Sequence, residues 1–336
     1  MPHRTHRLPP LHQIACLAAL LLAAFNTGCA SLPARNSAHP LDPPALRSLS
    51  TFRGDGTRAT FDDIVSAAAA ADVVIMGESH GHPVGLPWAA MLFDELTTAA
   101  PNAALSLEFF ERDDQSRIDD YLTGVTDEPT FLKRTSRSDG NYPSPHRAML
   151  ERAKSLSRPV IAANTPRAII RFLRGKDYSA LADLTPEQAR LFRIPSSPPQ
   201  GRYRADYDAL MGPMVESGHS AVKTNSAAPA APAMTIAQKQ VKLDASFRSQ
   251  YMWDWTMAES IVKAADAGNR PVVHVQGHFH CDFFGGTPQA VMNLRPNTKI
   301  IVISVITALS NTLRKEDHGR ADFLIYVGPA LSNATP

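Results

Sequence analysis

The stretch Ala71–His82, A-D-V-V-I-M-G-E-S-H-G-H, decides how the rest of the chain can be arranged. Its apolar run Val73–Met76 is too short for a self-standing helix and rich in β-branched side chains, which predicts a buried strand. Gly77 ends this run, and polar residues follow at once. In open α/β sheets, functional sites lie just beyond the carboxyl ends of the strands. The stretch therefore predicts both a strand of the sheet and a site at its end.

A second stretch repeats this arrangement in the other half of the chain. Pro271–His280, P-V-V-H-V-Q-G-H-F-H, is another apolar run that is broken by a glycine and followed by histidines. Both stretches contain G-x-x-H, at Gly77–His80 and at Gly277–His280. One such tetrapeptide is common by chance. Two of them, each after a predicted strand, indicate that the two halves of the chain contribute to one site.

The composition excludes several classes of function. The chain has 336 residues, of which 44% are hydrophobic, so it can bury the core of one large domain or two smaller ones. Its net charge of +2 provides no electrostatic footprint for nucleic acid, and we expect no nucleic-acid partner. The sequence contains neither a G-x-S-x-G nucleophile elbow nor a Walker-type phosphate-binding loop, which disfavours the enzymes that use them.

Residues 1–28 have the pattern of a secretory signal peptide. Arg4 and Arg7 form a positively charged start, and the unbroken apolar run Ile14–Phe25 follows. This run is too short to indicate a membrane-spanning helix, so we expect export and cleavage. No later segment of the sequence has the length and apolarity of a membrane span.

The junction Gly28-Cys29 resembles a bacterial lipobox, although Asn26 stands where an aliphatic residue is usual. We expect a lipid on Cys29 that anchors the protein in the cell envelope, at the outer membrane. A soluble exported protein is the alternative. Residues 29–50, rich in Pro, Ala and Ser, would form the tether. Cys281 is then the only cysteine of the mature domain, which excludes an internal disulfide.

Beyond residue 50, apolar runs alternate with helical segments, which is typical of the α/β class. We expect one domain over residues 51–330, with a mixed, largely parallel central sheet flanked by helices and the two G-x-x-H half-motifs meeting at one cleft. The first two strands and the helix between them predict a parallel pair with a right-handed crossover. The expected strands are Val73–Met76, Ala103–Phe110, Pro159–Ala163, the run that starts at Pro271, Lys299–Val305 and Phe323–Val327. The main expected helices are Trp88–Thr97, Gln115–Leu122, His146–Ser155, Ala168–Leu173, Phe247–Ala265 and Gln289–Leu294, with another that Thr60 or Asp62 would cap.

A proline-rich insertion interrupts this pattern at about residues 194–235. The segments Ile194–Gln200 and Asn225–Ala233 are the poorest candidates for regular structure in the mature domain. We therefore expect irregular, mobile parts in this region.

The candidate catalytic residues are Glu78, His80, Glu108 and His280, each of which follows or ends a predicted strand. Carboxylates and imidazoles in one place suit a divalent metal ion, with the same four residues and His278 as ligands. They suit metal-free acid–base catalysis equally well. Taken singly, each histidine is more simply explained as a surface or hydrogen-bonded side chain, so the prediction depends on the whole set.

Tyr142 is a further candidate because it lies in a polar loop between Asn141 and Pro143. An outward-facing tyrosine can bind haem iron as a phenolate. A tyrosine that packs against its own loop is an equally good interpretation.

In several motifs the chain resembles the ChaN family of haem-binding uptake lipoproteins, in the Tiki/TraB and erythromycin-esterase-like group. The resemblance covers nearly the whole mature chain except the proline-rich insertion. The motifs that carry it are M-G-E-S-H-G-H at Met76–His82, S-L-E-F-F-E-R-D-D-Q at Ser106–Gln115, N-Y-P-S-P-H at Asn141–His146, A-A-N-T-P-R at Ala162–Arg167, Q-Y-M-W-D-W-T-M-A at Gln250–Ala258 and G-H-F-H at Gly277–His280.

The resemblance implies an envelope protein that binds haem or iron for uptake and meets a haem or iron carrier or receptor of the cell envelope. A homodimer is left open. The wider group includes hydrolases that use paired G-x-x-H histidines and strand-end glutamates, so a metal-assisted or acid–base hydrolase is the alternative. His278 stands where relatives often carry Asn, which leaves the transfer of that chemistry open.

If haem is the ligand, the loop Asp139–His146 is the expected binding surface, apart from the acidic G-x-x-H cluster. Tyr142 and His146 would ligate the iron, and Arg147 or Arg167 would bind the propionates by charge-assisted hydrogen bonds. The expected cofactors are therefore haem and, for the cluster, a divalent metal ion.

Overall fold

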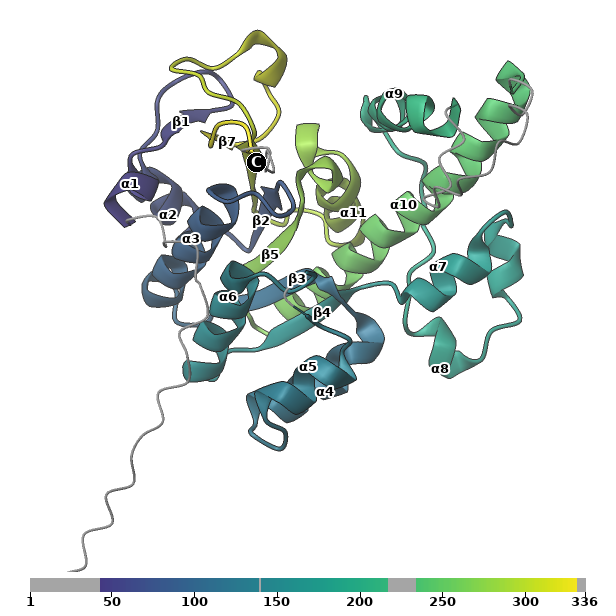
Figure 1. Cartoon of the computed structure of the whole chain (residues 1–336), viewed down its shortest axis with the longest axis horizontal. Coiled ribbons are helices and arrows are strands. Elements are labelled where there is room, and N and C mark those ends of the chain that lie inside the picture. The colour runs from purple at the N-terminus through teal and green to yellow at the C-terminus, as the bar shows by residue number, and fades with distance from the viewer. Residues whose placement is uncertain (1–42, 139, 217–233, 331–336) are drawn as a thin grey trace, which may run out of the picture. The chain divides into compact units, whose positions relative to one another are not determined.

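The opening stretch forms β2, the middle strand of a seven-stranded sheet in the computed structural model, which describes residues 43–138, 140–216 and 234–330. Within these residues the strand order is β1-β7-β6-β2-β5-β3-β4. Figure 1 labels all of these strands except β6. All neighbouring pairs are parallel except β1 with β7. The strands are β1 (Ser50–Arg53), β2 (Val73–Glu78), β3 (Ala104–Glu111), β4 (Val160–Asn164), β5 (Val272–Gly277), β6 (Ile300–Ile306) and β7 (Phe323–Tyr326).

The expected α/β class and largely parallel sheet are confirmed, but the expected direct pairing of β2 with β3 is wrong. The second G-x-x-H strand, β5, lies between them and pairs with both in parallel. All six residues of β5 are buried, as the centre of a sheet covered on both faces requires. The local strand–helix–strand pattern could not reveal that a strand from the far end of the chain is inserted there.

One face of the sheet is covered by helices from the first half of the chain. Leu92 and Phe93 of α3 are fully buried against sheet residues such as Val74 and Leu105. Thr60 begins α2 with a reciprocal capping box that includes Asp63, so the expected helix start is confirmed. The helices of this face include α1 (Pro43–Arg47), α2 (Phe61–Ala69), α3 (Gly85–Ala99) and α6 (Ser144–Ser155).

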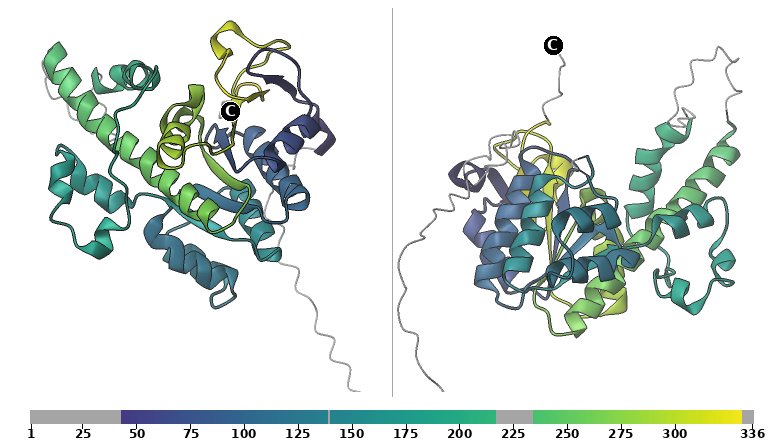
Figure 2. Two further views of the ribbon diagram at one scale, coloured as in Figure 1. Left: turned by 180° about the vertical axis from the view of Figure 1, so that it is seen from behind. Right: turned by 60° about the horizontal axis from the view of Figure 1, so that its bottom comes forward.

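The other face is covered by α10 (Ile236–Asp266) and α11 (Gly286–Leu294). Trp255 and Ile261 of α10 are fully buried in the same core as Val73 and Val272 of the sheet. Figures 1 and 2 show that α10 extends beyond the sheet, where further helices lie beside its N-terminal half. These helices are α7 (Arg167–Leu173), α8 (Pro186–Ala189) and α9 (Tyr203–Glu216). We call them, with the N-terminal half of α10, the helical lobe.

The proline-rich insertion is only partly irregular. Ile194–Gln200 has no helix or strand, as expected, whereas Asn225–Ala233 lies outside the described residues. Between them α9 forms, because Tyr203 and Tyr207 bury their rings in the core that also holds Phe247 of α10. Tertiary packing of these aromatic side chains therefore overrides the weak local signal.

The N-terminal predictions fall mostly outside the described residues. The signal peptide at 1–28, Cys29 and the tether up to residue 42 are not among them. The segment that follows forms α1 and enters β1, a short antiparallel strand that the sequence pattern did not indicate. None of the described helices combines the length and apolarity that a membrane crossing demands.

The open edge of the sheet at β4 is closed by one side chain of α4 (Gln115–Leu122), the helix that precedes α5 (Glu128–Arg134). The amide nitrogen of Gln115 donates to the carbonyl of Val160 at 2.9 Å, and its amide oxygen accepts from the N–H of Ala162 at 2.8 Å. The side chain thus bonds to the strand as the peptide group of another strand would. Two backbone groups that an edge strand leaves unpaired are satisfied in this way.

Candidate functional site

The two G-x-x-H motifs lie side by side because β2 and β5 pair in register, with Glu78 opposite Gly277. Each glycine faces the histidine region of the other motif. A Cβ on Gly277 would lie 3.0 Å from Nε2 of His80, and a Cβ on Gly77 would lie 2.8 Å from Cα of His278. Any other residue would crowd these contacts. The half-motifs therefore meet at the carboxyl ends of adjacent strands.

Glu78 lies between two imidazoles and is 1% exposed. His80 donates from Nδ1 to Oε1 of Glu78 at 3.0 Å, and His146 donates from Nε2 to Oε2 at 2.8 Å. Burial opposes the charge of Glu78, but the hydrogen bonds from His146 and His80 lower its pKa. The pKa of His80 is raised, chiefly by its hydrogen bond to Glu78. Glu78 is therefore a buried anion that holds two histidines in fixed orientations.

Glu108 and His280 form the second half of the cluster. The N–H of Gly277 donates to Oε2 of Glu108 at 2.6 Å, and Nε2 of His280 lies 3.7 Å from Oε1. The other ring nitrogen of His280 lies 2.7 Å from Oδ1 of Asp254. Burial alone would lower the pKa of His280, but the carboxylates of Asp254 and Glu108 raise it to about 9. The imidazole thus stays protonated at neutral pH between two acids.

Asp254 was not singled out in the sequence, although it stands in the quoted motif Gln250–Ala258. Its side chain is completely buried and accepts a hydrogen bond from the hydroxyl of Tyr203 at 2.6 Å. Burial raises its pKa. The available signal was an acid on the apolar face of a predicted helix, where a charged side chain is rare unless it has partners.

His278 does not join this cluster. Its Nδ1 donates to Asp282 at 2.8 Å, and the other oxygen of Asp282 accepts from Ser304 at 2.7 Å. In the described ranges, no three His, Cys, Asp or Glu side chains are grouped so that they could hold a metal ion. The expected metal set of Glu78, His80, Glu108, His278 and His280 therefore finds no support. Cys281 is buried, which raises the pKa of its thiol and disfavours a thiolate.

The expected haem surface of Tyr142, His146 and Arg167 is not formed. Tyr142 is 6% exposed and packs against the rings of Phe110 and Phe131, so the prediction of an outward phenol is wrong. Burial raises the pKa of that phenol above its ordinary value, which disfavours a phenolate.

His146 and Arg167, the other two residues of the expected haem surface, have other partners. His146 is buried as the partner of Glu78, and therefore belongs to the acidic cluster from which the haem surface was expected to be separate. Arg167 is exposed and pairs with Glu111 at 3.3 Å. Asp139, the first residue of the expected surface, lies outside the described residues.

His82, the last residue of the opening stretch, has a structural role. Its Nδ1 accepts hydrogen bonds from the N–H groups of Val84 and Gly85, and its Nε2 donates to the carbonyl of Gly328 at 3.0 Å. The imidazole thus binds backbone donors at the start of α3, as a capping side chain does.

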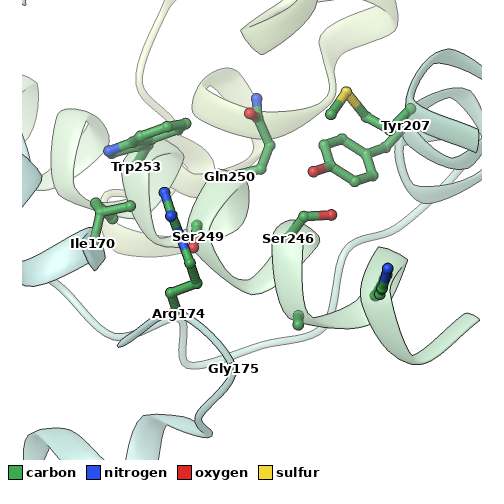
Figure 3. A pocket seen from close by; sticks show the side chains of 11 residues that line it. Ile170, Arg174, Gly175, Tyr207, Ser246, Ser249, Gln250 and Trp253 are labelled. Atoms are coloured by element: carbon green, nitrogen blue, oxygen red, sulfur yellow. The ribbon is translucent and has the colours of Figure 1, made fainter. Parts of the chain in front are cut away.

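A pocket of about 590 Å³ lies in the helical lobe. Figure 3 shows Trp253 and Tyr207 on opposite sides of it, with Gln250 and Ser246 between them. Gln250 also connects the pocket to the cluster, since its amide nitrogen donates to the hydroxyl of Tyr203 at 3.2 Å. The pocket is lined by Ile170, Arg174, Gly175, Tyr207, Met211, Lys242, Ala245, Ser246, Ser249, Gln250 and Trp253.

Comparison with solved structures identifies the fold. The structure reported as cofacial haem binding to ChaN of Campylobacter jejuni aligns with a TM-score of 0.59 at 15% identity, covering 83% of this chain and 97% of that one. The type III effector HopBA1 aligns with a TM-score of 0.42 at 13% identity, covering 80% and 93%. A Bacillus cereus protein gives 0.41 at 14% identity, covering 74% and 70%. At these identities the likeness to ChaN concerns the fold alone.

The sequence itself matches a family model over residues 64–291, which includes both G-x-x-H motifs and the residues that line the pocket. No curated protein matches the chain. The matched model is described as haem-binding uptake, Tiki superfamily, ChaN. The resemblance drawn from the motifs is therefore confirmed, and the chain belongs to the haem-binding uptake family of ChaN.

Proposed function

We propose that this protein binds haem for uptake and that the haem lies in the pocket of the helical lobe. The observation that carries the proposal is the chemistry of the pocket walls. Trp253, Met211 and Ile170 offer apolar and aromatic surface for a flat macrocycle, and Arg174 and Lys242 offer cations for its propionates. At the cluster, in contrast, the carboxylates of Glu78 and Glu108 would repel the propionates.

Tyr207 takes the place of Tyr142 as the candidate iron ligand. Its ring is also buried, in the core around Phe247, but its hydroxyl is turned toward the middle of the pocket in Figure 3, whereas Tyr142 is not among the residues that line this pocket. Burial raises the pKa of the Tyr207 phenol, so its deprotonation depends on bonding to a cation such as ferric iron. Haem supplies that iron, and the chain supplies the phenol oxygen and the apolar walls. Acid should then release haem, because a proton competes with the iron for the oxygen.

Haemin titration of the purified protein tests this proposal. The wild type should develop a Soret band. Tyr207→Phe should shift that band and weaken affinity about tenfold or more, which corresponds to about 1.4 kcal/mol. Tyr142→Phe is the matched control and should leave the spectrum unchanged. Absence of any haem-dependent band in the wild type, or a silent Tyr207→Phe beside an altered Tyr142→Phe, would overturn the assignment.

We also propose that a lipid on Cys29 anchors the domain at the outer membrane, where it meets a haem or iron carrier or receptor. The charged start, the apolar run and the Gly28-Cys29 junction support this. Cys29→Ala should move the protein from the membrane fraction to the soluble fraction, whereas Cys281→Ala, as control, should not. Retention of the Cys29→Ala protein on membranes would show that another feature anchors it.

Acid–base hydrolysis is a second candidate, favoured by the pairing of His280 with both Glu108 and Asp254. A protonated imidazole 3.7 Å from a carboxylate can donate a proton to a leaving group while the carboxylate activates water. With aryl esters as substrates, Glu108→Gln should lower kcat at least about a hundredfold. Glu111→Gln, on the same strand, is the control. Equal loss in both variants, or no hydrolysis by the wild type, would reject this candidate.

A further inference from the structure

His280 and Asp254 are held together more closely than any other histidine–carboxylate pair of the cluster. Nδ1 of His280 lies 2.7 Å from Oδ1 of Asp254, and both side chains are at least nine-tenths buried. The amide nitrogen of Gln250 lies 3.1 Å from the same Nδ1, but it also donates to the hydroxyl of Tyr203. Since hydrogen bonds to an ionised acceptor are the stronger ones, the Nδ1 proton goes to the carboxylate.

The carboxylate is itself fixed by neutral hydroxyl groups. Tyr203 donates to its Oδ2 at 2.6 Å, and Oγ1 of Thr287 lies 3.1 Å from its Oδ1 and shares its single proton with Oε1 of Gln276 at 2.9 Å. No described Lys or Arg side chain forms an ion pair with Asp254, so its charge is balanced by the imidazole alone. A buried carboxylate in such surroundings costs folding free energy, and an apolar residue would pack there at lower cost.

The backbone also makes room for this carboxylate. Gly286 has a φ of +49°, and a Cβ at that position would lie 2.5 Å from the carbonyl oxygen of His280 and 2.8 Å from Oδ1 of Asp254. The first residue of α11 is therefore a glycine in a conformation that other residues rarely adopt. Two independent features, the hydroxyl donors and the glycine, thus accommodate the carboxylate of Asp254, although folding stability does not require a charged residue at this position.

We infer that Asp254 is a positioning residue that fixes the tautomer and ring orientation of His280. With Nδ1–H held by Asp254, the Nε2 atom of His280 faces Glu108 and is the atom that exchanges a proton with a ligand. Tyr203 supports Asp254 from α9. The use of this orientation in a reaction rests on the acid–base hydrolysis proposed above. The orientation itself is a property of the protein without any ligand.

The test is ¹⁵N NMR of the histidine rings at pH 10, above the titration of His280, with His280→Gln to identify the signals. The wild type should carry its proton on Nδ1. Asp254→Asn should lose this tautomer, because an amide nitrogen facing the ring forces Nδ1 to accept and moves the proton to Nε2. The titration midpoint of His280 should also fall by about one to three pH units, since a neighbouring opposite charge is removed.

Tyr203→Phe provides a variant that keeps the aromatic packing and the carboxylate, so it tests the same inference if Asp254→Asn fails to fold. It should keep the Nδ1–H tautomer, because the carboxylate of Asp254 is still present to accept that proton. Tyr251→Phe, in the same aromatic cluster and with a hydroxyl that donates to no described residue, is the matched control and should behave as the wild type. An Nδ1–H tautomer with an unshifted midpoint in Asp254→Asn, or an Nε2–H tautomer of His280 in the wild type or in Tyr203→Phe, would overturn the inference. If the wild type hydrolyses no ester, the acid–base candidate is rejected, but the orientation of His280 can still be tested by NMR.

Discussion

Nε2 of His146 lies 2.8 Å from Oε2 of Glu78, so a side chain from the first turn of α6 completes the carboxylate environment at the end of β2. The ring of Phe109, on β3, lies against this imidazole with the ring centres 4.0 Å apart. Three elements are therefore joined at one buried carboxylate. This contact merges the loop before α6 with the G-x-x-H cluster, which the sequence had suggested were separate sites.

Glu78→Gln should destabilise the protein by about 1–3 kcal/mol at pH 7, because His80 and His146 lose a charged acceptor. The pKa of Glu78 is lowered in the folded state, so its contribution is present above its unfolded pKa of about 4.5 and is lost as the pH falls through the folded value. Urea unfolding at pH 7 and below pH 4 measures both effects. Glu187→Gln, an exposed position of α8, is the control. A difference from the wild type that stays constant with pH would contradict this prediction.

Stability should fall between pH 6.5 and pH 9 because of His280. Its pKa is raised from 6.5 to about 9 on folding, so its contribution is fully present below pH 6.5 and is lost as the pH rises through 9. The full effect corresponds to about 3 kcal/mol. Thermal unfolding across this range should show a decline that His280→Asn reduces to the part contributed by the raised pKa of His80, and that His318→Asn, at an exposed histidine, leaves in place. A flat profile in the wild type would be evidence against the Asp254–His280 ion pair.

The two motif glycines should differ in their tolerance of alanine. At Gly77 the added Cβ would meet the backbone Cα of His278 at 2.8 Å, which cannot move without shifting β5 and the turn after it. At Gly277 it would meet the imidazole of His80 at 3.0 Å, a side chain that is 59% exposed and can move aside by weakening its hydrogen bond to Glu78. Gly77→Ala should therefore cost about 1–3 kcal/mol, as overpacked cores do, and Gly277→Ala clearly less. Chemical denaturation of both variants gives the order, and the reverse order would refute the argument.

Gln115→Ala should expose the edge of β4. The carbonyl of Val160 and the N–H of Ala162 would lose their partner, at a cost of about 1–3 kcal/mol, and become free to pair with another chain. Light scattering on gentle heating should show faster aggregation than in the wild type. Ser116→Ala, the next residue of α4, is the control. Unchanged aggregation with an unchanged unfolding midpoint would mean that water replaces the amide without consequence.

The sequence predicted those features that depend on local pattern. Val73–Met76 and the run from Pro271 read as strands because they are short, apolar and β-branched, and the helix Gln115–Leu122 was predicted with its observed ends. The residues after each strand were correctly expected to share one end of the sheet.

What the sequence could not give depends on contacts between distant segments. The position of β5 between β2 and β3 is set by the whole set of strands, and no local signal encodes it. Tyr142 is buried by Phe110 and Phe131, which come from different elements. Asp254 acquires its role only when α10 is laid against His280, since its sequence neighbours show the pattern of an ordinary helix.

The consecutive positions of Trp253 and Asp254 on α10 restrict how the family can vary in length. Trp253 lines the pocket, whereas the side chain of Asp254 points toward the end of β5 and bonds to His280. One inserted or deleted residue turns the following part of a helix by about 100°, so such a change between Gln250 and Asp254 would spoil both sites at once. A change before Thr235, where the helix begins with its capping box, leaves the phase of the helix intact. Insertions and deletions should thus accumulate ahead of α10 and be absent from its middle.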